Sequence, residues 1–403
     1  MMRSMFSAVS GLRNHQTYMD VVGNNIANIN TTGFRASRVA FQDVLSQTLR
    51  QATGPYGDLG GLNPVQIGLG VALASIDQVQ TQGALQSTGK ITDLALEGDG
   101  YFILGDGNGL YYSRDGAFDR GIDGSLVNAV GLKVMGWQAV NGVVDTSQPL
   151  TAITLPIGQD MRAYTSEHVN ISGNLDAATA VGASASTDVS VRDSLGNGHL
   201  LTITFTRNAA LNTWDWEGTV NGASVGTGTI TFDGNGAVSV GGTGTVSIPM
   251  TNGATDPLAL EVDFSALKQL AGLSEVQATA DGAPAGSLTT FVIDSFGVIT
   301  GVYSNGVRET LAQIAVAKFA NPGGLVKVGG NLLEASMNSG TAQLGTAGTG
   351  GRATLAAGFL EMSNVDLAQQ FTNLIMAERG FQANSRVISA SDEILQDLVN
   401  LVR

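Results

Sequence analysis

The chain contains no cysteine among its 403 residues, and it has few charged side chains and few histidines. Without cysteine it forms no disulfide bond, so its stability must come from packing or from assembly. The three histidines, His15, His168 and His199, are scattered and form no recognisable set of transition-metal ligands. Charged residues make up 13% of the chain, against roughly 25% in an average soluble domain. The polar surface therefore depends on Ser, Thr, Asn and Gly.

Clusters of basic side chains are also missing, and the formal net charge is −14. Nucleic acids and anionic membranes are bound by grouped Lys and Arg side chains, so we expect neither as a partner. No run of about 18 apolar residues occurs, which predicts no membrane insertion. The apolar stretch near the N-terminus is broken by Ser7, Ser10 and Arg13, unlike a cleaved signal peptide. The composition fits a cytoplasmic protein or one exported without a cleaved signal.

Three short segments resemble catalytic or binding motifs, and each is incomplete. Residues 222–226 fit the Gly-x-Ser-x-Gly pattern of hydrolases, but every histidine precedes them, against the usual chain order. Residues 83–90 resemble a phosphate-binding loop that is one residue too long, and Ile91 stands where Ser or Thr would bind magnesium. Residues 106–109 resemble half a calcium loop without its spaced carboxylates. We therefore predict no catalytic residue, no cofactor and no metal site, and a chain that is not an enzyme.

The interior of the chain is rich in glycine and in turn dipeptides. Apolar residues make up 43%, enough to fill real cores, and Gly accounts for 54 residues. Because glycine supplies the positive φ that tight turns need, this content favours strands and turns over helices. The turn dipeptides that separate short alternating runs are Asp115-Gly116, Asp123-Gly124, Asn197-Gly198, Asp233-Gly234 and Asn305-Gly306. We predict a mainly β interior, with an irregular Gly/Pro-rich connection over residues 53–64.

Helical periodicity is confined to the two ends of the chain. Near the N-terminus, apolar residues step by four and three, which predicts a helix over residues 1–30 that ends at Thr31-Thr32-Gly33. This stripe consists of Met5, Val9, Leu12, Gln16, Met19, Gly23 and Ile26, with Val22 beside Gly23.

Near the C-terminus the same spacing runs further and predicts a longer helix. Ser363-x-x-Asp366 precedes it and has the pattern of a capping box. The stripe consists of Leu367, Phe371, Leu374, Glu378, Phe381, Ser385, Ile388, Asp392, Leu395, Val399 and Val402. Its polar members weaken packing but favour one register of a coiled coil. An ordinary amphipathic helix on a globular core would show the same periodicity.

Several segments resemble the flagellar axial family, the rod and hook proteins. They are Met19-Asp-Val-Val-Gly-Asn-Asn-Ile-Ala-Asn28 with Thr31-Thr-Gly-Phe-Arg35, Asp93-Leu-Ala-Leu-Glu-Gly-Asp-Gly-Tyr-Phe102 with Tyr112-Ser-Arg-Asp-Gly-Ala-Phe118, and Ser363-Asn-Val-Asp-Leu367 with Ala377-Glu-Arg-Gly-Phe-Gln-Ala-Asn-Ser385 and Asp392-Glu-Ile-Leu395. They cover both ends and most of residues 70–140, in the order that the family shows. The extra length between about 145 and 288 favours a hook protein, since rod proteins are typically shorter. Residues 36–68, in contrast, look like the longer connection of the distal rod protein, which remains the alternative.

The resemblance implies a mixed, mainly β fold in which two β-rich domains are nested between terminal helices that pair as a coiled coil. The expected parts are an inner helical domain (1–30 and 360–403), a connecting segment (31–70), a middle β domain (71–145 and 288–359) and an outer β domain (146–287). It also implies a structural subunit that assembles into a flexible helical tube, joins the basal-body rod to the filament and transmits torque for motility. A discrete soluble binding protein or enzyme would instead show no polymer as its concentration rises.

The implied partners are further copies of the chain, the distal rod protein, a hook cap protein, the hook–filament junction proteins and the flagellar type III export apparatus. The implied location is the hook of the flagellum, next to the basal body and outside the cell, after export without a cleaved signal. The resemblance assigns subunit assembly to Met5, Val9, Leu12, Met19, Val22, Asn24, Asn25, Ile26, Asn28, Leu367, Phe371, Leu374, Phe381, Ile388, Leu395 and Val399, helix capping to Ser363 and Asp366, and the connecting segment to Thr32, Gly33, Phe34, Phe41 and Leu45.

Overall fold

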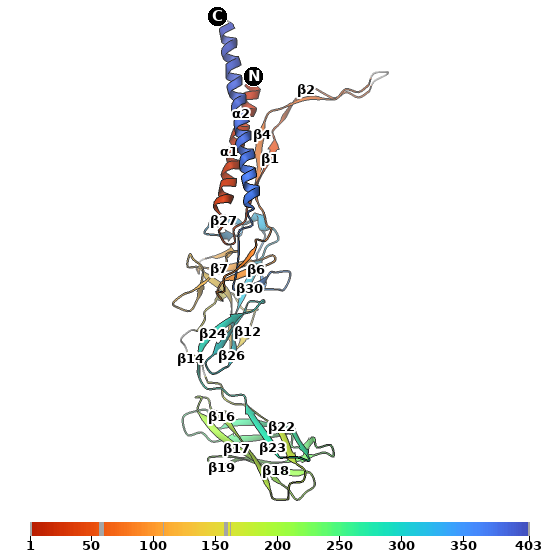
Figure 1. The fold of residues 1–403 in the computed structure, drawn as a ribbon, viewed down its shortest axis with the longest axis vertical. Coiled ribbons are helices and arrows are strands. Elements are labelled where there is room, and N and C mark those ends of the chain that lie inside the picture. The colour runs from red at the N-terminus through yellow and green to blue at the C-terminus, as the bar shows by residue number, and fades with distance from the viewer. Residues whose placement is uncertain (1, 56–59, 108, 157–159, 162, 402–403) are drawn as a thin grey trace. The chain divides into compact units, whose positions relative to one another are not determined.

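The computed structural model describes residues 2–55, 60–107, 109–156, 160–161 and 163–401 (Figure 1). Its contacts divide the chain into two compact units. Unit 1 consists of Met1–Leu155, Val292–Thr300 and Thr310–Arg403, and unit 2 of Pro156–Phe291 and Gly301–Glu309. The helical ends therefore belong to the same unit as the β structure next to them in sequence. The finer division into inner, connecting, middle and outer parts stays a prediction.

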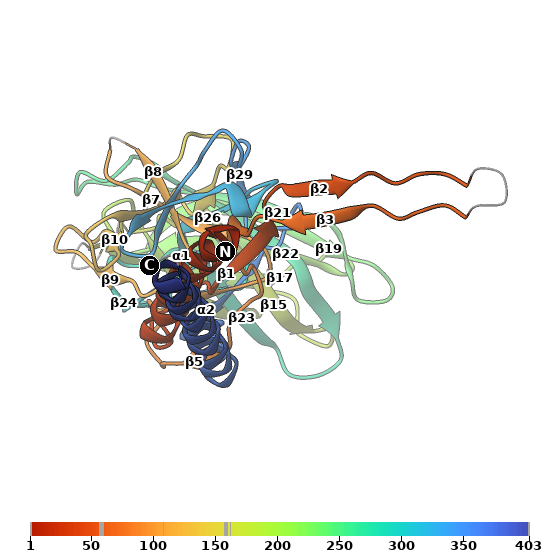
Figure 2. The same ribbon diagram turned by 90° about the horizontal axis from the view of Figure 1, so that it is seen from above.

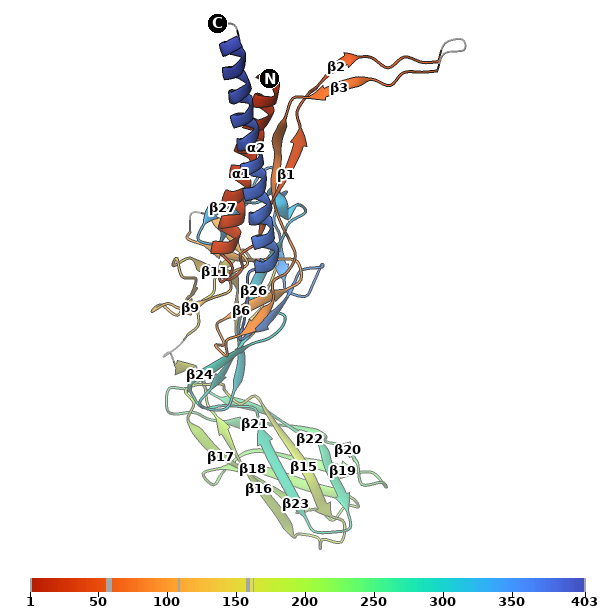
Figure 3. The ribbon, with the colours of Figure 1, turned by 45° about the horizontal axis from the view of Figure 1, so that its top comes forward.

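The two helices lie at the ends of the chain and pack side by side (Figures 1 and 3). Helix α1 spans Met2–Ala27 and helix α2 spans Leu367–Leu401, so the prediction of paired terminal helices is confirmed. Helix α1 ends a few residues earlier than expected, because beyond Asn28 the backbone changes to i→i−3 hydrogen bonds, from Ile29 N–H to Ile26 O and from Thr31 N–H to Asn28 O. The end of the expected C-terminal stripe, Val402, lies outside the described residues.

Strands β1 to β4 form a long antiparallel hairpin on either side of the Gly/Pro-rich stretch. Strand β1 (Ser37–Asp43) pairs with β4 (Val71–Gln78), and β2 (Ser46–Arg50) pairs with β3 (Val65–Gly68). Between β2 and β3 the described residues form no strand, and an isolated bridge joins Thr53 to Leu62, while residues 56–59 lie outside the described residues. The irregular backbone expected over 53–64 is thus present in its described residues, whereas the flanking strands were not predicted.

The remaining strands of unit 1 form one main sheet and two small ones. The main sheet has the strand order β26-β11-β7-β8-β28-β27 within this unit, while β6 pairs with β30 and β5 pairs with β31. Strands near the start of the chain are thus paired with strands near its end. The bounds are β5 (Leu85–Ser87), β6 (Leu94–Glu97), β7 (Tyr101–Gly105), β8 (Leu110–Ser113), β9 (Asp119–Arg120), β10 (Leu126–Val127), β11 (Lys133–Val140), β12 (Val143–Val144), β13 (Thr151–Ala152), β26 (Arg308–Lys318), β27 (Val326–Gly329), β28 (Leu332–Glu334), β29 (Gln343–Thr346), β30 (Thr354–Ala357) and β31 (Phe359–Glu361), with a 3-10 turn at Pro322–Gly324.

Unit 2 is built around two sheets that enclose one apolar core. One sheet has the order β21-β22-β15-β23 and the other β16-β17-β18-β19-β20. Strand β22 alternates buried and exposed residues along most of its length, as a strand with one face on a core must. The bounds are β14 (Asp160–Met161), β15 (His168–Asp176), β16 (Ser184–Arg192), β17 (Gly198–Arg207), β18 (Thr213–Val220), β19 (Ala223–Phe232), β20 (Val238–Val240), β21 (Thr243–Ile248), β22 (Leu258–Leu270) and β23 (Glu275–Ala280), while β24 (Gly286–Ile293) and β25 (Val298–Tyr303) carry residues of both units.

Neither described helix combines the length and the apolar character that a membrane span requires. Among the described side chains, no three His, Cys, Asp or Glu residues are grouped as metal ligands would be.

Candidate assembly surface

The helix pair is held together by small side chains rather than by the large apolar ones. A Cβ added at Gly11 would lie 2.6 Å from Asn384 Nδ2, and one added at Gly380 would lie 2.4 Å from the His15 ring. Further along, Asn25 Nδ2 donates to Gln370 Oε1 at 3.2 Å. As residue numbers rise on α1 they fall on α2, so the helices run antiparallel and approach closely. The buried residues of this contact include Ala8, Gly11, Val22 and Asn25 on α1 and Ala377 and Ser391 on α2.

The apolar stripe expected on α1 lies beside this contact. Val9 follows buried Ala8, and Leu12 follows buried Gly11, so each is turned by about 100° around the helix from the contact line. Val22 is buried and Val9 is exposed, while Met5, Leu12, Met19 and Ile26 are partly exposed. The stripe predicted from periodicity consists mainly of large apolar residues, whereas the observed contact between the helices contains small ones because the helices approach closely. The assignment of the stripe to subunit assembly stays a prediction.

The same holds for α2, where large apolar side chains remain open to solvent. Phe371 is 48% exposed and Phe381 is 37% exposed, although both were expected in the apolar stripe along which the helices pair. Leu374, Ile388 and Leu395 are partly buried, and Leu367 and Val399 are exposed. Sequence analysis missed further exposed residues that lie off the four-three spacing: Phe6, Ile375, Met376, Val387 and Ile394. Contiguous exposed apolar surface of this kind marks an interaction site.

The N-terminal cap of α2 differs from the expected capping box. Asp366 is the residue directly before the helix, and its Oδ1 accepts a hydrogen bond from the backbone N–H of Gln369 at 3.1 Å. Ser363 lies outside the helix, and its Oγ accepts from the backbone N–H of Val365 at 3.3 Å. Asp366 alone therefore caps α2, because its carboxylate satisfies an N–H in the first turn and faces the positive end of the helix dipole.

Asparagines on α1 attach the hairpin to the helix. Asn25 is 1% exposed, and its side chain pairs with the backbone of Ser37 through two hydrogen bonds of 2.9 and 2.7 Å. Asn14 Nδ2 donates to Val71 O at 2.8 Å. Phe41 of β1 packs edge-on against the Tyr18 ring, 5.8 Å between centroids. The predicted residue Asn28 instead closes the end of α1, with Nδ2 donating to the carbonyl of Asn24 at 2.9 Å.

Beyond β1 and β4 the hairpin extends as an arm of β2 and β3 that leaves the helix pair (Figure 2). Leu45 is 79% exposed, and most apolar side chains along the arm are open as well. These are Leu45, Leu49, Leu62, Val65, Ile67 and Leu69. An isolated two-stranded hairpin is marginally stable in water, so an apolar arm of this kind needs another surface to pack on.

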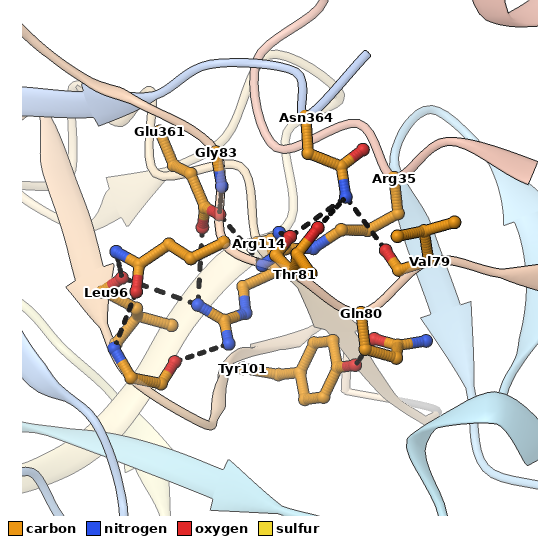
Figure 4. A network of polar contacts seen from close by, with 12 residues as sticks. Arg35, Val79, Gln80, Thr81, Gly83, Leu96, Tyr101, Arg114, Glu361 and Asn364 are labelled. Atoms are coloured by element: carbon orange, nitrogen blue, oxygen red, sulfur yellow. Dashed lines mark hydrogen bonds and ion pairs between the residues drawn. The ribbon is translucent and has the colours of Figure 1, made fainter. Parts of the chain in front are cut away.

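A buried ion network joins the base of the helices to the β structure of unit 1 (Figure 4). Arg35 Nη2 lies 2.8 Å from Glu361 Oε1, and Arg114 Nη1 lies 3.3 Å from Glu361 Oε2. All three side chains are at most 7% exposed. Burial lowers the pKa of the Arg114 guanidinium, and the charge of Glu361 opposes that effect. Sequence analysis missed these roles, although the three matching segments included Arg35 and Arg114.

The residues expected to form a connecting segment are anchored in the same place. Thr32 Oγ1 donates to Asp115 Oδ1 at 2.8 Å, and the backbone N–H of Gly33 donates to Glu361 O at 2.8 Å. Gly33 has φ 66° and its missing Cβ would lie 2.6 Å from the Asp115 nitrogen, so both conformation and space require glycine. The Lys327 ammonium lies 5.0 Å from the centre of the Phe34 ring. The start of the expected connection is therefore packed against the β structure, whereas Leu45 is free of it.

Family models of flagellar proteins match most of the chain. They describe a flagella basal body rod protein over residues 5–35, a flagellar hook protein FlgE/F/G D1 domain over 95–177, a flagellar basal body protein FlaE D2 domain over 162–283 and a flagellar basal body rod FlgEFG protein C-terminal over 356–401. The class that the fold and these matches define is a structural protein of the flagellar axis.

Curated relatives show to which protein family within that class the chain belongs. The flagellar hook protein FlgE of Treponema pallidum is 41% identical, and that of Borreliella burgdorferi is 40% identical, each over the full length of both chains. The flagellar basal-body rod protein FlgG of Bacillus subtilis is 32% identical over the same extent. The chain belongs to the flagellar hook protein family and is a structural subunit of the hook. The hook hypothesis is thereby confirmed over the distal rod alternative.

A solved structure supports the fold. The Helicobacter pylori flagellar hook protein FlgE2 matches 69% of this chain and 100% of its own, with a TM-score of 0.55 and 16% sequence identity.

Proposed function

We propose that this chain polymerises through its two helices and its hairpin arm into a flexible tube that joins the basal-body rod to the filament and transmits torque. The observation that carries the proposal is the row of large apolar side chains that α1 and α2 leave exposed, including Phe6 and Phe371. Burying each such side chain is worth about 1.5–3 kcal/mol, which the single chain does not gain. Neighbouring copies supply that burial.

The arm gives the proposed polymer a second contact. Its exposed apolar residues lie away from the helix pair, so their partner surface belongs to another copy. Two different surfaces that each bind a neighbour make heterologous contacts, and such contacts generate an open helical filament rather than a closed pair. The two ends of such a tube contact other proteins. The proposed partners at these ends are the distal rod protein, the hook cap protein and the hook–filament junction proteins.

Export by the flagellar type III apparatus is part of the same proposal. Delivery through that apparatus places the chain outside the cell, where polymerisation takes place. The support for this is the membership of the chain in the flagellar hook protein family.

The test is to replace Phe371 on the exposed face of α2. In Phe371→Asp a charge must be buried in the polymer, so we expect the critical concentration to rise by at least about tenfold. The free energy of unfolding of the single chain should change by less than about 0.5 kcal/mol, because the side chain is half-exposed there. Sedimentation and electron microscopy measure the polymer, and urea titration measures the chain.

Two matched variants complete the design. Phe371→Leu keeps the apolar side chain and should assemble nearly as the unsubstituted chain does. Ala390→Asp adds the same charge at an exposed position on the side of α2 that carries Arg379 and Arg386, about 100° around the helix from Phe371. If Phe371→Asp assembles as readily as Ala390→Asp, or if it unfolds the single chain, the assignment of this face to assembly is wrong.

A further inference from the structure

A pocket of about 240 Å³ lies where the end of α1 meets the β structure of unit 1. Its walls include Asn28, directly after α1, and the segment around Phe34 and Arg35. They also include Tyr101 of β7, Arg114, which directly follows β8, and Lys327 of β27. Every one of these residues belongs to unit 1, so the pocket is formed within one compact part of the chain.

Positive charge dominates the pocket. Arg35, Arg114 and Lys327 line it, and Glu361 is the carboxylate that bridges the two guanidinium groups. Lys327 makes no ion pair with any carboxylate of the described residues, and it lies instead against the Phe34 ring. Lys327 is exposed, so a group from outside the chain can reach its ammonium, and partial burial of the side chain lowers its pKa.

Neighbouring negative charge does not cancel this excess. The Asp99 carboxylate lies 3.8 Å from Lys318 Nζ, and the Asp115 carboxylate accepts hydrogen bonds from Thr32 and from the backbone of Ala117. The C-terminal end of α1 contributes only about half an elementary negative charge, which is smaller than the excess of full positive charges.

The two guanidinium groups beside the pocket are not fully hydrogen-bonded. Within the described residues, Nε of Arg35 and Nε of Arg114 are buried and have no acceptor. Both side chains are more than nine-tenths buried, and their other nitrogens are engaged with Glu361 and with backbone carbonyls. A buried cation that is incompletely paired is costly. A negative charge placed in the pocket would offset the excess of positive charge on Arg35, Arg114 and Lys327.

We propose that this pocket receives the carboxylate of an acidic side chain from a second copy of this chain. The inference rests on the proposed self-assembly, and it adds a specific polar contact to the apolar ones. Charge complementarity favours a second copy, because the chain carries 34 Asp and Glu against 20 Lys and Arg. The contact aligns neighbouring copies, since charge-assisted hydrogen bonds are strong and directional.

The first experiment is zero-length cross-linking in assembled tubes. Tubes are grown from an equal mixture of ¹⁴N and ¹⁵N chains and treated with a carbodiimide, which joins a lysine amine to a carboxylate in contact with it. We expect Lys327 to be joined to an acidic residue in peptide pairs of mixed isotope content. Lys90 and Asp119, whose charged atoms lie 2.6 Å apart within the chain, serve as the internal control and should give unmixed pairs. Absence of mixed pairs at Lys327 while the control pair forms would overturn the proposal.

The second experiment measures assembly of charge variants. In Lys327→Glu the critical concentration should rise about tenfold, because like charges then meet in the pocket, and in Lys327→Met it should rise less. Lys268→Glu makes the same change of net charge on an exposed strand residue of unit 2 and should stay within about twofold of the unsubstituted chain. Equal effects of the two Glu variants, or none in either, would contradict a contact at the pocket.

A free anion is the alternative occupant, and inorganic phosphate and citrate test it. Three results together would assign the pocket to a small anion. Phosphate or citrate would raise the melting temperature of the single chain, Lys327→Glu would abolish that rise, and Lys327 would give no mixed-isotope pairs in tubes. The assignment to a second copy would then be wrong. If the unsubstituted chain forms no tubes at all, the proposed self-assembly itself fails, which is a different result.

Discussion

Phenylalanine side chains are buried in the two-sheet core of unit 2 and largely exposed on the terminal helices. In unit 2 Phe264 is 0% exposed and packs against the rings of Phe205 and Trp216 at 5.9 and 5.1 Å. On the helices Phe6 is 67% exposed and Phe371 is 48% exposed. The first region has buried its apolar surface within one chain. The second keeps that surface open, and in a subunit of a polymer open surface is what neighbours bind.

The difference follows from geometry rather than from composition. A pair of sheets has two facing surfaces, so alternate residues of every strand meet a partner inside the chain. Two helices have a single line of contact, and here small residues such as Gly11 and Gly380 occupy it. Large apolar side chains on the remaining faces are then left without a partner. We therefore expect the two-sheet core to resist unfolding in the single chain, and the helix pair to gain stability from the proposed assembly.

The largest expected effect comes from making one substitution in both regions. Phe264→Ala should lower the free energy of unfolding of unit 2 by about 3–5 kcal/mol, because it leaves a cavity in a filled core. Phe6→Ala should change the stability of the single chain by less than about 0.5 kcal/mol and should raise the critical concentration for polymerisation. Urea titration followed by tryptophan fluorescence measures the first effect, and sedimentation measures the second. A comparable loss of chain stability in both variants would remove the contrast between the two regions.

An intermediate effect is expected from a buried carboxylate in unit 2. Burial by itself raises the pKa of Asp193, but hydrogen bonds from Asn252, His199 and Asn197 outweigh it and hold the pKa below its usual value. A lowered pKa in the folded state gives stability that is present above the unfolded value near 3.8 and is lost as the pH falls through the folded value. Asp193→Asn should therefore cost about 2 kcal/mol at neutral pH and flatten the loss of stability below pH 4.

Urea titrations at neutral and acidic pH measure this effect. Asp188→Asn is the control, because Asp188 is exposed and accepts one hydrogen bond, from Thr202. Unchanged acid sensitivity in Asp193→Asn would mean that other groups set the pH dependence of unit 2.

The smallest expected effect distinguishes two glycines of the helices. Gly380→Ala places a Cβ 2.4 Å from the His15 ring, so either this ring or the helices must shift, and we expect a net loss of about 1 kcal/mol. Gly23→Ala meets no atom within 4 Å and should stabilise α1 by about 0.5–1 kcal/mol through helix propensity. Hydrogen exchange of the α1 and α2 amides in dilute protein measures both. Stabilisation by Gly380→Ala would show that the helices do not pack closely in the single chain.

Sequence analysis predicted the kind of elements better than their contacts. Turn dipeptides gave the correct β character, although of their five glycines only Gly124 and Gly306 have positive φ. The Gly/Pro-rich stretch around Thr53 is irregular as expected, but the strands that flank it were missed, because their pairing depends on residues distant in sequence. Of the two expected capping residues, Asp366 caps α2 and Ser363 does not.

By itself the sequence determined that the ends are helical, that the interior is mainly β, and which family the chain resembles. Each of these depends on local spacing or on short strings of residues that can be read without coordinates. Only the tertiary structure decided that Gly11 and Gly380, rather than Val9 and Phe381, lie in the contact between the helices. It also decided that Arg35, Arg114 and Glu361 form ion pairs at the base of the helices. The physical reason is that hydrophobic periodicity reports how much apolar surface a face carries. Close approach and ion pairing depend instead on the volume and charge of a partner that lies far away in the chain.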